Sequence, residues 1–194
     1  MKERIINCTL NQIEVSGLQK LTMDTIASEL HVSKRTIYQH FQSKEQLLET
    51  CLKEWLLRNK LLVPTGGNLI DELCALYTGI QSIDLPQVVH RCSELRKYSA
   101  PVHLFFLEQL FDYADTCGVW AERDADTGYL RRNISRHTVS AVVSDFLIRL
   151  FGNSEDHLFY RSYLLSPEIL IVFTRGLCTI KGRAYLDQRL KTLA

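Results

Sequence analysis

One basic segment near the N-terminus carries side chains that could recognise nucleic acid. The chain of 194 residues is almost neutral, with 23 Lys and Arg against 22 Asp and Glu. Yet the stretch HVSKRTIYQHF, residues 31–41, holds Lys34 and Arg35 and no acidic residue. Arg35, Tyr38 and Gln39 follow helical spacing and would share one face of a helix. A guanidinium can pair with guanine, an amide with adenine, and a hydroxyl or ammonium with phosphate. The segment fits a DNA-contacting surface, against the alternative of an ordinary solvated helix face.

Two short helices joined by a tight turn would position these side chains. Thr22 can cap a helix over residues 23–30, because its side-chain oxygen accepts a hydrogen bond from the first turn. Ser33 can cap a second helix after only two intervening residues, which is the connection of a helix-turn-helix. Ile37 and Phe41 are four residues apart, so they can anchor the second helix from its inner face. The N-terminal end of that second helix is the part that reaches base edges in helix-turn-helix proteins.

The segment from Ile5 to Leu48 resembles the DNA-binding domain of the tetracycline-repressor (TetR) family of bacterial regulators. The resemblance covers about the first quarter of the chain, centred on LTMDTIASELHVSKRTIYQHFQSKEQLL. It rests on the mutual spacing of Gly17, Thr22, Ile26, Ala27, Val32, Ser33, Tyr38, Phe41 and Lys44. It implies that phosphates are held by Thr22, Ser33, Tyr38, His40 and Lys44, and that Lys34, Arg35, Thr36 and Gln39 lie at or near base edges.

Two positions depart from the pattern of that family. His31 stands at a turn position where the family usually has glycine, and a positive φ at this turn would cost a histidine some strain. Asp24 stands where some members have a basic residue, so we assign no DNA contact to it.

The remaining pattern predicts an all-α protein. Glycine and proline number only nine and four, and they separate segments in which apolar residues recur at helical spacing. We expect about nine helices. A three-helix DNA-binding domain would occupy residues 1–46, and a helical ligand-binding and dimerisation domain would occupy residues 47–194.

The second domain shows apolar stripes but no motif that carries chemistry by itself. Two stripes fit the dimer interface of the family, although the plain alternative for each is monomer core. The predicted interface residues are Val139, Val142, Val143, Phe146 and Leu150 on one helix and Ile169, Val172, Phe173, Gly176, Leu177 and Ile180 on another. The resemblance also implies a ligand pocket between residues 68 and 125. Its candidate lining residues are Tyr77, His90, Cys92, His103, Phe106, Leu110 and Tyr113, each with ordinary core packing as the alternative.

Several classes of function find no support in the sequence. His90 and Cys92 are two apart, so on a helix they point away from each other, and no nucleophile with an activating base is evident. The six cysteines are far apart without a C-x-x-C pair, which favours buried reduced thiols over a metal site or disulfide framework. The apolar stretches are too short to span a bilayer, and the N-terminus lacks the apolar core of a signal peptide. We expect a cytoplasmic protein that is not an enzyme and has no cofactor, no metal and no membrane partner.

Together these features predict a sequence-specific transcription regulator. Its partners would be double-stranded DNA, a second copy of itself and a small-molecule ligand. It would act as a repressor that the ligand releases from an inverted-repeat operator. The alternative is a helical interaction protein with a non-functional helix-turn-helix.

Overall fold

The computed structural model describes residues 1–151 and 166–193 of the chain, and these residues form ten α-helices and one short 3-10 helix. The helices are α1 (Lys2–Ser16), η1 (Leu18–Lys20), α2 (Met23–Leu30), α3 (Lys34–Tyr38), α4 (Lys44–Arg58), α5 (Leu69–Gln81), α6 (Leu85–Tyr98), α7 (Ala100–Asp126), α8 (Arg136–Phe151), α9 (Glu168–Leu177) and α10 (Ile180–Leu193). The prediction of an all-α protein with an N-terminal helix-turn-helix is confirmed. Within the described ranges, no helix is long and apolar enough to cross a membrane.

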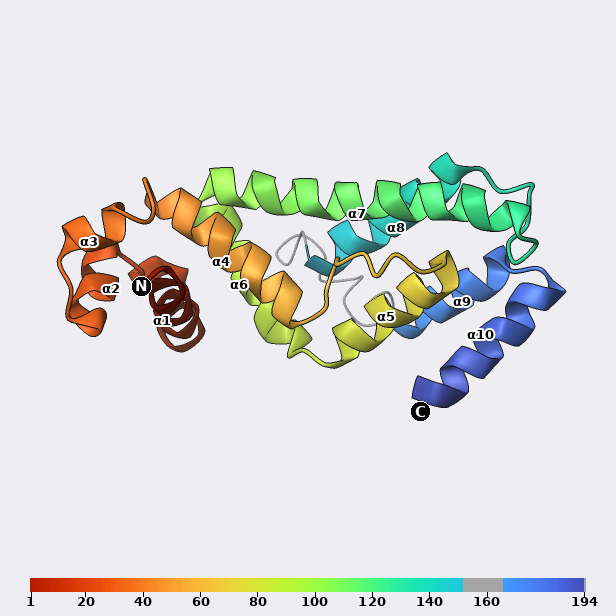
Figure 1. The fold of residues 1–194 in the computed structure, drawn as a ribbon, viewed down its shortest axis with the longest axis horizontal. Helices are drawn as coiled ribbons and strands as arrows, with labels where there is room; N and C mark the ends of the chain where they lie inside the picture. Colours follow the sequence, from red (N-terminus) through yellow and green to blue (C-terminus); the bar gives the residue numbers. More distant parts are fainter. Residues whose placement is uncertain (152–165, 194) are drawn as a thin grey trace.

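The molecule is elongated, with helices α1–α3 at one end and α10 at the other (Figure 1). α4 leads from the N-terminal helices into the body, and α7 runs along one side of the body over much of its length. Two hydrophobic cores correspond to these parts. The smaller core gathers α1–α3 and the start of α4, and the larger one gathers α4–α10. The cores are not fully separate, because Leu95 of α6 and Val102 of α7 are buried in the smaller one.

The C-terminal stripe from Ile169 to Ile180 does not lie on a single helix, as its spacing had suggested. α9 ends at Leu177, and Cys178 takes an extended conformation with φ −74° and ψ 144°. The cause is an antiparallel bridge between Cys178 and Leu130, beside which the Arg131 N–H donates to the Leu177 carbonyl oxygen at 2.9 Å. α10 starts afresh at Ile180. This break adds one helix to the predicted number.

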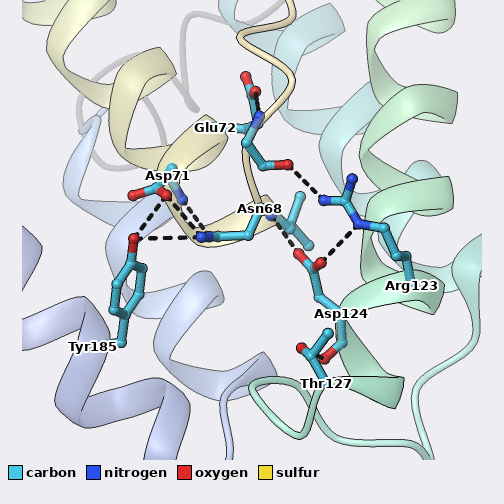
Figure 2. Close-up of polar contacts among 9 residues, drawn as sticks. Asn68, Asp71, Glu72, Arg123, Asp124, Thr127 and Tyr185 are labelled. Atoms are coloured by element: carbon cyan, nitrogen blue, oxygen red, sulfur yellow. Dashed lines mark hydrogen bonds and ion pairs between the residues drawn. The ribbon is translucent and has the colours of Figure 1, made fainter.

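A partly buried polar network joins the start of α5, the end of α7 and the middle of α10 (Figure 2). The Asp124 carboxylate of α7 accepts a hydrogen bond from the Leu69 N–H at the start of α5, at 2.6 Å. Tyr185 of α10 donates its hydroxyl to Asp71 of α5 at 2.8 Å. Arg123 lies beside Asp124 at 3.0 Å. Asp124 is only 3% exposed, so losing the Leu69 N–H and Arg123 as donors would leave a buried carboxylate unsatisfied. The network therefore fixes how α5, α7 and α10 meet.

Candidate nucleic-acid interface

Side-chain caps define both helices of the helix-turn-helix. Thr22 caps α2, with its Oγ1 accepting from the Thr25 N–H at 3.0 Å, and the Thr25 hydroxyl accepts in return from the Thr22 N–H. Ser33 caps α3 through a hydrogen bond from the Thr36 N–H at 3.1 Å. Ile37 and Phe41 are 0% and 2% exposed, so the predicted inner anchors are confirmed. α3 is therefore held to the domain by its inner side while its outer side stays open.

The turn between α2 and α3 passes through a left-handed residue. His31 has φ 54° and ψ 43°, and its N–H donates to the Ser28 carbonyl oxygen at 3.2 Å. The next N–H, that of Val32, reaches back to the Ala27 carbonyl oxygen at 3.0 Å. This arrangement closes the C-terminus of α2, a role that usually falls to glycine because it adopts positive φ freely. The expectation of a positive φ at residue 31 is confirmed.

The candidate DNA-contacting residues gather on the outer side of these elements. Lys34, Arg35, Tyr38, Gln39 and His40 are exposed on α3 or directly after it. Thr22 and Ser33 are also exposed, at the N-termini of α2 and α3, whereas Thr36 and Lys44 are half-buried. The guanidinium of Arg35, the amide of Gln39 and the phenol of Tyr38 thus share one solvent-facing surface, which we call the reading face. The set can supply both base-edge and phosphate contacts.

An acidic residue lies within this face. The Asp24 carboxylate binds the Lys34 ammonium with a 2.9 Å separation between Oδ2 and Nζ, and both side chains are well exposed. The hydrogen bond and charge of Asp24 raise the pKa of Lys34. Lys34 is therefore already paired, and a phosphate would have to compete with Asp24 for it.

Lys44 has a structural contact that the sequence did not reveal. Its Nζ donates to the Leu21 carbonyl oxygen at 2.6 Å, which ties the start of α4 to the residue before the α2 cap. Ser43 caps α4 by accepting from the Gln46 N–H at 3.1 Å. An ammonium has three N–H donors, so one contact to Leu21 leaves others for a phosphate. Lys44 can hold the domain together and still present positive charge at a helix N-terminus.

Residues 5–51, which form this unit, match the family of bacterial regulatory proteins, tetR family. The chain thus carries a DNA-binding domain of the tetR family over these residues. Relatives described as uncharacterized HTH-type transcriptional regulators, from Mycobacterium bovis and Mycobacterium tuberculosis, are 32% identical over 72 residues. The matched segment covers 37% of this chain and only 35% of the length of those relatives.

Solved TetR-like structures share the fold over nearly the whole chain. A TetR-family transcriptional regulator from Marinobacter aquaeolei VT8 has a TM-score of 0.60 and 15% identity, with 98% of each chain covered. A gamma-butyrolactone receptor has a TM-score of 0.60 and 18% identity, over 98% of this chain and 94% of the other. BioQ, solved with its DNA operator, has a TM-score of 0.52 and 18% identity, over 89% and 96%. At these identities the likeness establishes the fold alone.

The candidate pocket residues do not converge on one site. A cavity of about 360 Å³ lies where α1, α4 and α6 meet, and of the seven candidates Cys92 and Phe106 line it. Leu110 and Tyr113 are buried in the larger core, and Tyr77 packs against that core. His90 is exposed on α6, and His103 is half-buried with its pKa lowered by burial and by Arg96. Most of the cavity wall comes from residues that the sequence did not single out, because α1 and α4 lie outside the predicted ligand region.

The candidate interface residues divide into two groups. Val139, Val143, Phe146, Leu150 and Leu177 are buried by their own chain and belong to its larger core. Ile169 and Phe173 are half-buried against that core. Val142, Val172 and Ile180 are 40%, 71% and 88% exposed, and a Cβ built at Gly176 would meet no atom within 4 Å. Of these candidates, only the last group presents apolar surface that the described residues leave uncovered.

All six cysteines are buried free thiols, as the sequence suggested. Burial raises the pKa of Cys51 and Cys92 to about 12, and that of Cys8 and Cys178 to about 11. The reactive species of cysteine is the thiolate, so burial disfavours the reactive form of these side chains near neutral pH. Among the residues that the structure describes, no group of His, Cys, Asp and Glu could hold a metal ion.

Proposed function

We propose that the protein is a homodimeric transcription regulator that binds an inverted-repeat DNA operator and leaves it when a small molecule binds. The observation that carries this proposal is the reading face, an exposed cationic and amide-bearing surface on a capped helix whose other side is anchored by Ile37 and Phe41. In this proposal Arg35 and Gln39 read base edges, and Tyr38, His40 and Lys44 hold phosphates. Thr22, Ser33, Lys34 and Thr36 complete the contact.

Dimerisation follows from the size of the reading element. α3 has only five residues, so one copy contacts few base pairs. A two-fold pair engages two half-sites about 34 Å apart, or at a wider spacing, and gains affinity from both. Val142 of α8 and Val172 and Gly176 of α9 supply exposed apolar or open surface for the second copy. We place the dimer interface on these helices.

Release by a ligand requires that two states of the dimer differ in their affinity for DNA. A coupling free energy of about 1–3 kcal/mol between a ligand site and the reading faces is typical of such proteins. The direct route is a change in the separation of the two reading faces. Repression follows if the operator overlaps a promoter.

Selection of bound sequences from a random duplex pool tests the proposal. An enriched inverted repeat, with affinity that falls steeply with added salt, is the expected result. The alternative of a helical interaction protein with a non-functional helix-turn-helix predicts no enrichment and no binding to any duplex. Chemical cross-linking or sedimentation of the free protein measures the dimer independently of DNA.

A further inference from the structure

The cavity between α1, α4 and α6 lies at the junction of the two cores. Its wall includes Leu10 and Ile13 of α1, Trp55 of α4 and Val88 and Leu95 of α6. Its volume of about 360 Å³ is within the range of small-molecule sites. One side of the cavity therefore belongs to the DNA-binding domain, and the other belongs to the body of the protein.

A polar contact holds α1 and α6 together at the edge of this cavity. Arg91 of α6 donates to the Glu14 carbonyl oxygen at 2.9 Å and to the Glu94 carboxylate at 2.7 Å. Gly17, with φ 79°, makes the close approach possible, because a Cβ there would lie 2.8 Å from Glu94 Oε1 and 3.0 Å from an Arg91 nitrogen. Arg91 thus binds a free carbonyl at the C-terminal end of α1 and links it to α6.

One buried donor of Arg91 is not used in these contacts. Its Nε is buried and has no hydrogen-bond acceptor among the described residues. A buried N–H without an acceptor carries a desolvation cost, which an acceptor oxygen entering the cavity would remove. The rest of the wall is mainly aliphatic and aromatic, with Leu48, Leu52 and Phe106 next to the residues named above. The occupant should therefore be largely apolar with one acceptor group.

The local charge selects a neutral occupant. Glu14 and Arg91 are the charged residues of the wall, and Glu94 adds a second carboxylate beside Arg91. The three groups sum to one negative charge, so a ligand carboxylate would be repelled as well as desolvated. A carbonyl oxygen accepts the same N–H without that cost. A cationic head group would be drawn to the exposed Glu14 but would leave the Arg91 N–H unsatisfied.

We propose that this cavity is a binding site for a small, neutral, mainly apolar molecule whose carbonyl oxygen accepts a hydrogen bond from Arg91. Only the consequence of binding rests on the proposed function: an occupant that contacts both α1 and α6 loosens or shifts the DNA-binding domain. Binding at the cavity is measurable without DNA.

Intrinsic fluorescence provides the direct test. The chain has two tryptophans, and Trp55 is the one on the cavity wall. In a Trp120→Phe variant, methyl octyl ketone should change the emission saturably, and decanoate and decyltrimethylammonium should bind at least about tenfold more weakly. The converse variant, Trp55→Phe, should show no response. Tighter binding of either ion, or no saturable response to the ketone, overturns the site as described.

Matched substitutions separate the cavity from the surface. Val88→Phe fills the cavity and should abolish the ketone response, whereas Val119→Phe, on the exposed side of α7, should leave it unchanged. The double variant Arg91→Met with Glu94→Gln removes the donor and its counter-charge together, and it should weaken the ketone while the thermal transition of the protein remains cooperative. Equal ketone binding by Val88→Phe or by the double variant refutes the assignment.

Binding to the selected operator, measured with and without the ketone, tests the consequence. If the ketone weakens operator binding by the native protein but not by the Val88→Phe variant, the cavity is a regulatory site. Tryptophan quenching without any effect on operator binding refutes the coupling and leaves the cavity site standing. Absence of DNA binding under all conditions refutes the proposed function, and the fluorescence result still decides whether the cavity binds the ketone.

Discussion

Replacing Asp24 with asparagine should strengthen DNA binding, although the substitution removes an ion pair. Asp24 lies on the reading face, where its carboxylate holds Lys34 at 2.9 Å and adds negative charge beside the phosphates. Asparagine has nearly the same shape and can still accept a hydrogen bond near the start of α2. The Asp24→Asn variant therefore frees Lys34 for a phosphate without altering the helix-turn-helix.

The magnitude follows from counterion release. One additional phosphate contact makes the slope of log K against log salt more negative by about 0.9. Over a fourfold rise in salt, the advantage of the variant should shrink by a factor of about 3.5. The gain is therefore largest at low salt, and it applies to all sequences about equally because phosphates carry no base identity.

Fluorescence anisotropy with the selected operator and with a scrambled duplex, each over a salt series, measures both slope and affinity. Asp115→Asn, on the exposed side of α7, is the matched control because it makes the same change of net charge away from the reading face. If Asp24→Asn and Asp115→Asn behave alike, or if Asp24→Asn weakens binding, then Lys34 is not a phosphate ligand and the electrostatic account of the reading face is wrong.

Four further predictions test other parts of the structure. Arg35→Ala should cost about 1–3 kcal/mol of operator binding and relax the preference at one base pair, and unchanged preference in a repeated selection would contradict a base contact. His31→Gly should raise the free energy of unfolding by up to about 1 kcal/mol in a urea titration, because glycine adopts the left-handed turn without strain. Gly118→Ala should lower it by about 1–3 kcal/mol, because a Cβ there would lie 2.7 Å from the Arg136 carbonyl oxygen where α7 meets α8; stability equal to the native protein would contradict that close approach. The thiols should react slowly with a disulfide reagent in the native state at pH 8 and rapidly in denaturant, because burial raises their pKa to about 11–12 and limits access.

The helix-turn-helix was predictable because its determinants are local. Caps at Thr22 and Ser33 act over three residues, and the pair Ile37 and Phe41 identifies the buried side of α3 by spacing alone. The contacts that tune the site are not local in this sense. Lys34 meets Asp24 only because the turn brings α3 against α2, and Lys44 meets Leu21 across 23 positions of the sequence. Spacing along one helix cannot show such pairs.

The same limit explains the errors in the second half of the chain. The apolar stripe through residues 169–180 continues at helical spacing. On either side of Cys178, however, the Leu177 carbonyl oxygen accepts from the Arg131 N–H and the Thr179 N–H donates to the Tyr129 carbonyl oxygen, both in the segment before α8. An apolar stripe also does not distinguish a core from an interface. The stripe of α8 includes Val143 and Leu147, which are 0% exposed, and Val142, which is 40% exposed. The cavity was missed because its wall joins α1 to α6, which meet in the Arg91 contact to the Glu14 carbonyl oxygen across 77 positions of the sequence.

α4 contributes buried residues to both hydrophobic cores. Leu47, Leu48 and Cys51 of this helix are buried in the smaller core, while Leu56, two turns later, is buried in the larger one. The proposed boundary between residues 46 and 47 therefore falls inside a continuous helix and not in a linker. Because Leu95 and Val102 also complete the smaller core from α6 and α7, a fragment of residues 1–46 would lose part of its own interior. In the proposed mechanism, a displacement of α6 would therefore act on the N-terminal helices through these packed side chains and through the Arg91 contact to α1.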